Sequence, residues 1–206
     1  MPEDVVYLGR GTDGLDAARA FVERVVSEEY DQVVGAVVRA DVAAHAAAFD
    51  PEHDVLMTAQ RDARLVGVLL VTRDLADPDA ARFDWLIVEA SARNGGVGRE
   101  LLFRGIEACR ERRRVVLRAR SFAVSPAGPH LFWLHGFRVV GLVPVTVGEE
   151  TRESILFEKR LSPLASPGAS ALLERPCFPP LLADARPARL RSDRKAVCGP
   201  SARRST

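Results

Sequence analysis

One stretch, residues 83–102, constrains the fold of this sequence more than any other. It reads FDWLIVEASARNGGVGRELL, which leads from an apolar strand through a glycine-rich loop directly into an amphipathic helix. Glycines let the backbone approach a ligand closely, and the free N–H groups at a helix N-terminus attract anions. With Arg93 and Arg99 on either side of the loop, the segment predicts a site for a phosphate or a pyrophosphate.

Two common phosphate-binding loops do not fit this segment. A P-loop closes with lysine followed by serine or threonine, whereas here Arg99 and a glutamate follow the glycines. The dinucleotide-binding fingerprint needs a third glycine three residues after Gly98, where Leu101 stands, and an acidic residue closing the next strand, which Val115–Arg120 lacks. The remaining pattern is Arg-x-x-Gly-x-Gly over residues 93–98, which a glycine turn of purely structural purpose also produces.

Proline and charge divide the 206-residue chain near residue 161. Residues 162–206 contain seven of the 13 prolines, and they carry eight basic residues against three acidic ones. Prolines at this density exclude a long helix or a central strand. We therefore predict a folded domain over residues 1–161 and a disordered Pro/Ala/Arg-rich tail over residues 162–206.

Composition and charge exclude several classes of protein. A chain that is 47% hydrophobic and 28% charged can bury a core, and a formal net charge of +1 argues against a dedicated nucleic-acid binder. No apolar run is long enough for a membrane span, and the N-terminus does not resemble a secretory signal. Cys109, Cys177 and Cys198 lie too far apart for a disulfide framework or a metal cluster, and Cys109 is expected to be a buried hydrophobe. We expect a cytoplasmic protein without a metal.

Periodicity predicts a mixed sheet with helices on its faces. The expected strands cover residues 5–8 (an edge strand), 55–60 and 65–73 (a hairpin), 83–88, 115–120, 138–147 and 152–161. The expected helices cover residues 31–48, 98–112 and 129–135, and a further helix ends near residue 29.

The order of these elements, with the Arg-x-x-Gly-x-Gly loop and the later run LFWLHGF (residues 131–137), resembles the GNAT superfamily of acyl-CoA-dependent N-acyltransferases. Residues 86–102 are similar to motif A of that family and residues 128–137 to motif B. The resemblance covers residues 4–161, and within the superfamily the chain resembles the acetyltransferase domains that some bacteria fuse to MarR-type regulators. It implies a bacterial protein with an α+β fold, in which a mixed, mostly antiparallel central sheet carries helices on both faces.

The resemblance also implies a site for acetyl-CoA as co-substrate, with no metal. The pantetheine arm would lie between two splayed strands, against the backbone of the first, and the N–H groups of the loop would hold the pyrophosphate, with Arg99 adding a charge-assisted contact. The implied cofactor-binding residues are Leu86, Ile87, Val88, Arg93, Asn94, Gly95, Gly96, Val97, Gly98 and Arg99.

Catalysis in this family transfers the acetyl group directly to an amine within a ternary complex. Asp84 is the carboxylate best placed to act as a base, because a period of two puts it on the strand face of Leu86 and Val88. The family often has a tyrosine as general acid where this chain has Phe132, and an asparagine where it has Ser125, whose hydroxyl offers a replacement hydrogen bond. Asp84, Phe132 and Ser125 are therefore the candidate catalytic positions.

Two functions follow from this interpretation. The first is an N-acetyltransferase acting on an amine of a small molecule or a protein, and the alternative is a catalytically weak acyl-CoA-binding regulatory module that lacks the tyrosine acid. Neither nucleic acid nor a membrane is an expected partner. The acceptor amine and the oligomeric state stay open, a homodimer included.

Overall fold

The computed structural model describes residues 5–10, 14–122, 127–147 and 149–161, all of which belong to one compact unit, Met1–Pro167. The predicted tail over residues 162–206, with Cys177 and Cys198, lies outside the described residues, as does Ser125.

The centre of the fold is a seven-stranded sheet with the strand order β1-β2-β3-β4-β5-β7-β6. Its strands are β1 (Val6–Arg10), β2 (Val55–Arg61), β3 (Arg64–Arg73), β4 (Ala80–Val88), β5 (Val116–Phe122), β6 (Arg138–Val147) and β7 (Glu150–Arg160). Neighbouring strands are antiparallel except β4 and β5, which are parallel. The mixed, mostly antiparallel sheet is thus confirmed, and β1 lies at its edge as predicted.

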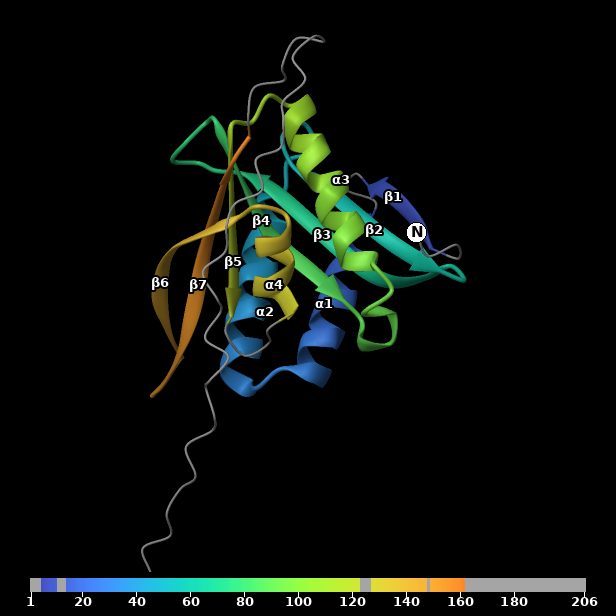
Figure 1. The fold of residues 1–206 in the computed structure, drawn as a ribbon. Coiled ribbons are helices and arrows are strands. Elements are labelled where there is room, and N and C mark those ends of the chain that lie inside the picture. The colour runs from blue at the N-terminus through green and yellow to red at the C-terminus, as the bar shows by residue number, and fades with distance from the viewer. Residues whose placement is uncertain (1–4, 11–13, 123–126, 148, 162–206) are drawn as a thin grey trace, which may run out of the picture. The chain divides into compact units, whose positions relative to one another are not determined.

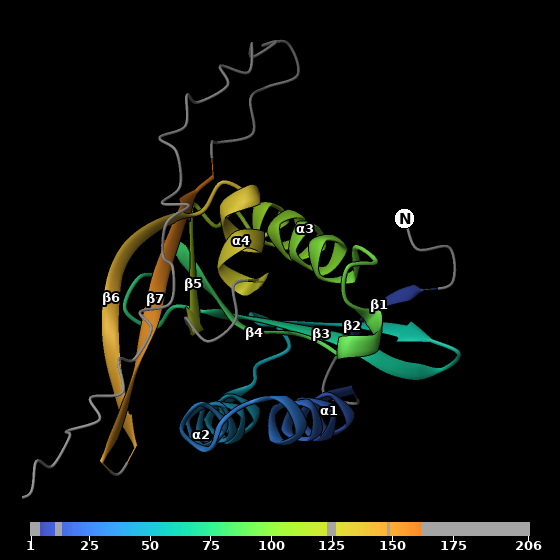
Figure 2. The same cartoon turned by 60° about the horizontal axis from the view of Figure 1, so that its bottom comes forward.

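Helices cover both faces of this sheet, as the sequence predicts (Figure 1). Turning the molecule shows α1 (Leu15–Glu29) and α2 (Gln32–Ala48) on one face, and α3 (Val97–Glu111) and α4 (Ala127–Leu134) on the other (Figure 2). A short 3-10 helix, η2 (Ala90–Ala92), connects β4 to the glycine loop. None of the described helices has the length and apolar character that crossing a membrane requires.

Local chemistry accounts for where several elements begin and end. The β2–β3 hairpin turns at Asp62 and Ala63, whose φ angles of 51° and 61° fit the tight turn that matches the twist of paired strands. At the start of α2 the Asp31 side chain accepts a hydrogen bond from the Val34 N–H at 2.9 Å. β4 begins at Ala80, three residues before the predicted start, because the turn over residues 77–79 leads directly into the strand.

Apolar side chains form one core on each face of the sheet. On the α1/α2 side, Val22, Val25 and Val26 of α1 pack with residues of the sheet such as Leu70 and Trp85. On the α3/α4 side the largest contributions come from α3 and from facing strand residues, among them Leu101, Leu102, Ile106, Cys109, Leu69, Phe83 and Leu117. Burial raises the pKa of the Cys109 thiol to about 12, so Cys109 is the buried hydrophobe that the sequence predicts and not a nucleophile.

The close contact between α3 and the sheet makes Gly105 a sensitive position. A Cβ atom there would lie 2.5 Å from Leu69 Cδ2 and 2.9 Å from Phe83 Cε1. We expect Gly105→Ala to lower the free energy of unfolding by about 1–3 kcal/mol, because overpacking of the core outweighs the gain in helix propensity. Urea unfolding measures this change.

Gly35→Ala in α2 is the matched control for that substitution. The three atoms nearest to its new Cβ would all belong to the flexible guanidinium of Arg39, with Nη1 at 3.1 Å. The free energy of unfolding should then stay the same or rise by up to about 1 kcal/mol through helix propensity. Equal stability of the two variants would contradict the tight α3–sheet contact.

Candidate active site

The candidate site lies where the parallel strands β4 and β5 separate. Their pairing runs from Ala80↔Val116 to Phe83↔Ala119, and beyond it no pairing joins the described residues of the two strands. β4 continues to Val88 and β5 to Phe122, so the sheet opens between them. A cavity of about 1060 Å³ occupies this opening. It is lined by β4, the glycine loop, the N-terminal turn of α3, β5, α4, Tyr30 after the end of α1, and part of α2.

The backbone of β4 presents polar groups to this cavity. Val88 is opposite Gly67 of β3, and the next residue, Glu89, donates its N–H to the Val66 carbonyl at 3.0 Å. In an antiparallel ladder, residues bonded to the partner strand alternate with residues whose N–H and C=O point the other way. Val88 and Leu86 therefore point their backbone groups away from β3, toward the opening. Both residues line the cavity, together with Ile87.

A β-bulge at Asp84 corrects one prediction. The register shifts between Leu70↔Trp85 and Val71↔Phe83, which leaves Asp84 as the extra residue on β4. Its side chain contacts β3 and α2, so it lies on the α1/α2 face, whereas Leu86 and Val88 pack into the α3/α4 core. The prediction that Asp84 shares the face of Leu86 and Val88 is wrong, because a bulge breaks the period of two.

The Asp84 carboxylate is 6% exposed and has three partners. Its Oδ2 accepts a hydrogen bond from Thr72 Oγ1 and lies 3.3 Å from His45 Nε2, and its Oδ1 accepts from Arg82 Nη2 at 3.0 Å. The other ring nitrogen of His45 lies 2.7 Å from the Asp41 carbonyl oxygen. The role of His45 could not be predicted from the sequence, because the contact arises from the packing of α2 on the sheet and not from a spacing along the chain.

The glycine loop offers unpaired N–H groups at the mouth of the cavity. Within the described residues, no hydrogen bond of normal geometry reaches the backbone N–H groups from Asn94 to Arg99. Gly96 precedes α3 with φ of 85°, a left-handed conformation that glycine adopts without strain, and Asn94 has φ of 61°. These N–H groups and the positive end of the α3 dipole together form a cradle for an anion.

Arg93 lines the cavity, but its N–H group is already bonded within the protein and is not free for the cradle. Its N–H donates to the Ala90 carbonyl at 3.2 Å, and its side chain donates from Nε to the Val88 carbonyl at 2.9 Å. Its guanidinium also forms an ion pair with Glu29 at the end of α1. Arg93 therefore ties the loop to β4 and α1, and the cradle begins at Asn94.

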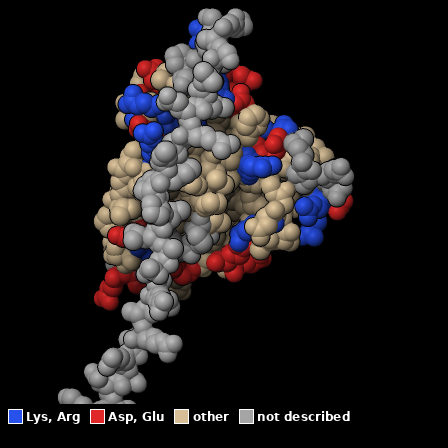
Figure 3. Space-filling model, in the orientation of Figure 1, with Lys and Arg blue, Asp and Glu red and all other residues tan. Residues whose placement is uncertain are grey.

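Arg99 is the cation that remains available at the loop. It lies in the first turn of α3, is exposed and lines the cavity. No hydrogen bond or ion pair links its side chain to another of the residues that the structure describes. On the face of the molecule drawn in Figure 3, much of the visible centre consists of uncharged side chains, and basic and acidic side chains alternate around the rim. Positive charge at the loop thus comes from Arg99 and the helix end.

Phe132 of α4 closes the cavity from the side of the α3/α4 core. It is 4% exposed, and its ring centroid lies 5.2 Å from that of Phe137 and 5.4 Å from that of Phe157. It lines the cavity without offering a hydrogen-bond donor. Ser125, the other candidate in this region, lies outside the described residues.

The cavity also reaches the α1/α2 side of the sheet. Tyr30, Val38 and Asp41 line it there, together with Asp84. The Asp41 carboxylate forms an ion pair with Arg120 of β5, which bridges α2 and the sheet. Burial raises the pKa of Tyr30, so its hydroxyl stays protonated at neutral pH. Residues from both sides of the sheet thus line one cavity.

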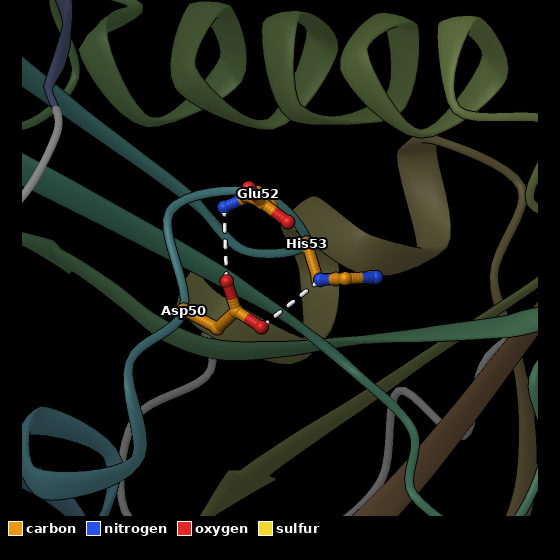
Figure 4. Close-up of side chains that lie close together, drawn as sticks. All are labelled: Asp50, Glu52 and His53. Carbon is orange, nitrogen blue, oxygen red and sulfur yellow. Dashed lines mark hydrogen bonds and ion pairs between the residues drawn. The ribbon is translucent and has the colours of Figure 1, made fainter.

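One group of potential metal ligands lies elsewhere, at the turn between α2 and β2. The ligand atoms of Asp50, Glu52 and His53 lie within 4.8 Å of one another (Figure 4). The Asp50 carboxylate accepts hydrogen bonds from the Glu52 N–H, His53 Nδ1 and Arg73 Nη1, each at 3.0 Å. These bonds close the turn, and they lower the pKa of Asp50, chiefly through the Glu52 N–H. The expected absence of a metal stays a prediction.

Comparison with known proteins yields a family match. Residues 16–147 match the model described as the Acetyltransferase (GNAT) family. No curated protein matches the chain.

Several solved structures share the fold. An N-acetyltransferase from Staphylococcus aureus Mu50 superposes with a TM-score of 0.63 at 16% identity, covering 78% of this chain and 100% of that one. The ribosomal-protein-S18-alanine N-acetyltransferase from Escherichia coli gives 0.59 at 18% identity, with coverage of 81% and 99%. A candidate acetyltransferase from Salmonella typhimurium, yncA, solved with its cofactor acetyl-CoA, gives 0.60 at 15% identity, with coverage of 82% and 100%. At these identities the likeness shows the fold alone.

Proposed function

The chain belongs to the GNAT family of acetyltransferases, and on that premise we propose that it transfers the acetyl group of acetyl-CoA to an amine of a small molecule or a protein, by direct attack within a ternary complex. The observation that carries this proposal is the cradle of unpaired N–H groups from Asn94 to Arg99 at the mouth of a cavity that passes between β4 and β5. A diphosphate fits such a cradle, because backbone donors, a helix N-terminus and the Arg99 cation converge there.

The divergence of the strands supports a position for the rest of acetyl-CoA. Leu86 and Val88 point backbone groups into the opening, where the amides of a pantetheine arm could bond to them as an added strand would. The Val88 carbonyl already accepts Arg93 Nε, so its N–H and both groups of Leu86 are available. The thioester would then lie near the point where β4 and β5 part, next to the bulge at Asp84.

The acceptor amine would approach from the opposite face of the sheet, where Asp84 and Asp41 line the cavity. Asp84 would take the proton that the amine nitrogen loses after it attacks the thioester carbonyl. One of the two N–H groups of Leu86 and Val88 would stabilise the oxyanion, while the other bonds to the pantetheine arm. Preorganised donors of this kind are often the largest contribution to catalysis. Arg82 and Thr72 hold the Asp84 carboxylate in position for this role.

Phe132 favours a second candidate function. Without a tyrosine hydroxyl at this position, the chain could bind acyl-CoA with little turnover and act as a regulatory module. A thiolate with a pKa of about 8.5 can be reprotonated by water, however, so the missing acid does not prevent acetyl transfer.

An assay of CoA thiol release with purified protein separates the two functions. Acetyl-CoA is supplied with a panel of amines that includes polyamines, amino acids, aminoglycosides and peptides with free N-termini, and calorimetry measures acetyl-CoA binding in parallel. The proposal predicts amine-dependent thiol release with at least one member of the panel. Binding without amine-dependent release would favour the regulatory module, and absence of both would contradict the cradle itself.

A further inference from the structure

We propose that Ser121 donates the hydrogen bond that stabilises the departing CoA thiolate. It would replace the tyrosine hydroxyl of the family, because this chain has Phe132 at the tyrosine position. This inference rests on the proposed acetyl transfer and identifies one further catalytic residue for it. Its evidence is the position of Ser121 on β5, the absence of a side chain at Gly128 and the absence of another hydroxyl on the same side of the cavity among the residues that the structure describes.

Ser121 lies at the point where the sheet opens. Ala119 is the last residue of β5 that pairs with β4, and Ser121 comes two residues later. The period of two in a strand puts Ser121 on the face of Leu117 and Ala119, which belong to the α3/α4 core. Ser121 lines the cavity from β5, whereas Leu86 lines it from β4. A thioester at the closed end of the opening would lie between these two strands.

The Ser121 hydroxyl also lies against the helix that carries Phe132. A Cβ atom on Gly128 would lie 2.7 Å from Ser121 Oγ and 3.8 Å from Ser121 Cβ. Gly128 precedes Phe132 by four residues, so both lie on the same side of α4. Any larger residue at 128 would therefore collide with the hydroxyl, and glycine leaves room for it beside the position where a tyrosine would project.

Within the described part of the chain, Ser121 carries the hydroxyl on this side of the cavity that is free to donate. Among the described residues that line the cavity, only Tyr30 and Ser121 carry a hydroxyl. Tyr30 packs against the α1/α2 core, on the acceptor side of the sheet. No hydrogen bond joins the Ser121 side chain to another residue in the described part of the chain, so its O–H is available to a ligand.

Departure of the CoA thiolate requires a hydrogen-bond donor near the sulfur, and it does not require a strong acid. The amine nitrogen forms a bond to the carbonyl carbon, the C–S bond breaks, and its electron pair stays on sulfur. The proton of the amine goes to Asp84 or to water, and solvent finally protonates the thiolate. Ser121 keeps its proton and donates a hydrogen bond to the sulfur as negative charge develops. A hydrogen bond to a charged group contributes about 1.5–3 kcal/mol, which corresponds to roughly 10- to 100-fold in kcat.

The first experiment compares Ser121→Ala with Ser154→Ala. We expect Ser121→Ala to lower kcat by about 10- to 100-fold while the Kd for acetyl-CoA, measured by calorimetry, stays within about threefold. Ser154 lies on β7 opposite Phe122, is fully buried and does not line the cavity, so Ser154→Ala should leave kcat unchanged. Equal kcat in Ser121→Ala and the parent protein would overturn the inference.

A double-mutant cycle with Gly128→Ala tests the geometry. In the parent protein the new methyl group displaces the Ser121 hydroxyl, so kcat should fall toward the Ser121→Ala value. In the Ser121→Ala background the two Cβ atoms are in ordinary contact, so Gly128→Ala should cost little more. Additive losses, with melting temperatures that show both variants folded, would contradict the placement of the hydroxyl. A parent protein without acetyl transfer would instead refute the proposed function.

Discussion

Replacing Gly96 by aspartate is expected to weaken acetyl-CoA binding by about two orders of magnitude or more. The substitution puts a carboxylate at the anion cradle, next to the free N–H groups from Asn94 to Arg99. Repulsion of the diphosphate, together with capture of the Arg99 guanidinium, should raise the Kd by about 100-fold or more, equivalent to at least about 2.7 kcal/mol. Isothermal titration calorimetry with acetyl-CoA measures this change.

Gly96→Asn is the control, because it has the same shape without the charge. Asparagine tolerates the left-handed conformation of residue 96, and a Cβ there would meet open space, with Arg99 Nη2 at 4.0 Å as its nearest neighbour. We expect this variant to bind acetyl-CoA within about tenfold of the parent affinity. Equal Kd values for the aspartate and asparagine variants, both folded, would contradict a diphosphate at this loop.

Asp84→Asn is expected to lower kcat by about 10²–10⁴-fold, the usual cost of losing a positioned base. The amide keeps the shape of the side chain and can still accept the hydrogen bond from Thr72, but it cannot take a proton from the amine. Because Asp84 lies on the face of the sheet opposite the cofactor cradle, the Kd for acetyl-CoA should not change. Steady-state rates at saturating amine, with calorimetry for the cofactor, give the two quantities.

Asp50→Asn provides the matched control for that substitution. Asp50 is a carboxylate on the turn that follows α2, outside the cavity, where it accepts hydrogen bonds from Glu52 and His53. Its replacement should leave kcat unchanged. Should Asp84→Asn keep kcat within about threefold of the parent value, the proton would be leaving by another route, such as a water chain.

The structural features that can be predicted from the sequence are those that depend on residues next to one another in the chain. The run from β4 through the glycine loop into α3 contains strand, loop and helix signals in order, and the β2–β3 hairpin shows two β-rich segments around a short polar turn. Both predictions are confirmed by the fold. The helix signal also predicted that Cys109 is buried, because it shares an apolar face with Leu102 and Ile106.

Contacts between residues far apart in the sequence, and irregularities of the backbone, cannot be predicted from such local patterns. The bulge at Asp84 depends on the register between β3 and β4, and it moves the carboxylate to the face opposite the one predicted. The contact of His45 with Asp84 joins α2 to the sheet across a long sequence separation. Likewise the ion pair of Arg93 with Glu29 brings together the loop and the end of α1. The residues around Arg93 in the sequence do not indicate whether its guanidinium forms an ion pair within the protein or contacts a phosphate.

An NMR titration of ¹⁵N-labelled protein with acetyl-CoA tests the cradle most directly, since it follows each backbone amide by itself. Saturation should shift the resonances from Asn94 to Arg99 further than those of the β2–β3 turn or the end of α3, and the Arg93 amide, already bonded to Ala90, should shift less than its neighbours. If acetyl-CoA binds tightly while these loop resonances stay in place, the diphosphate lies elsewhere and the active site assigned to this chain is wrong.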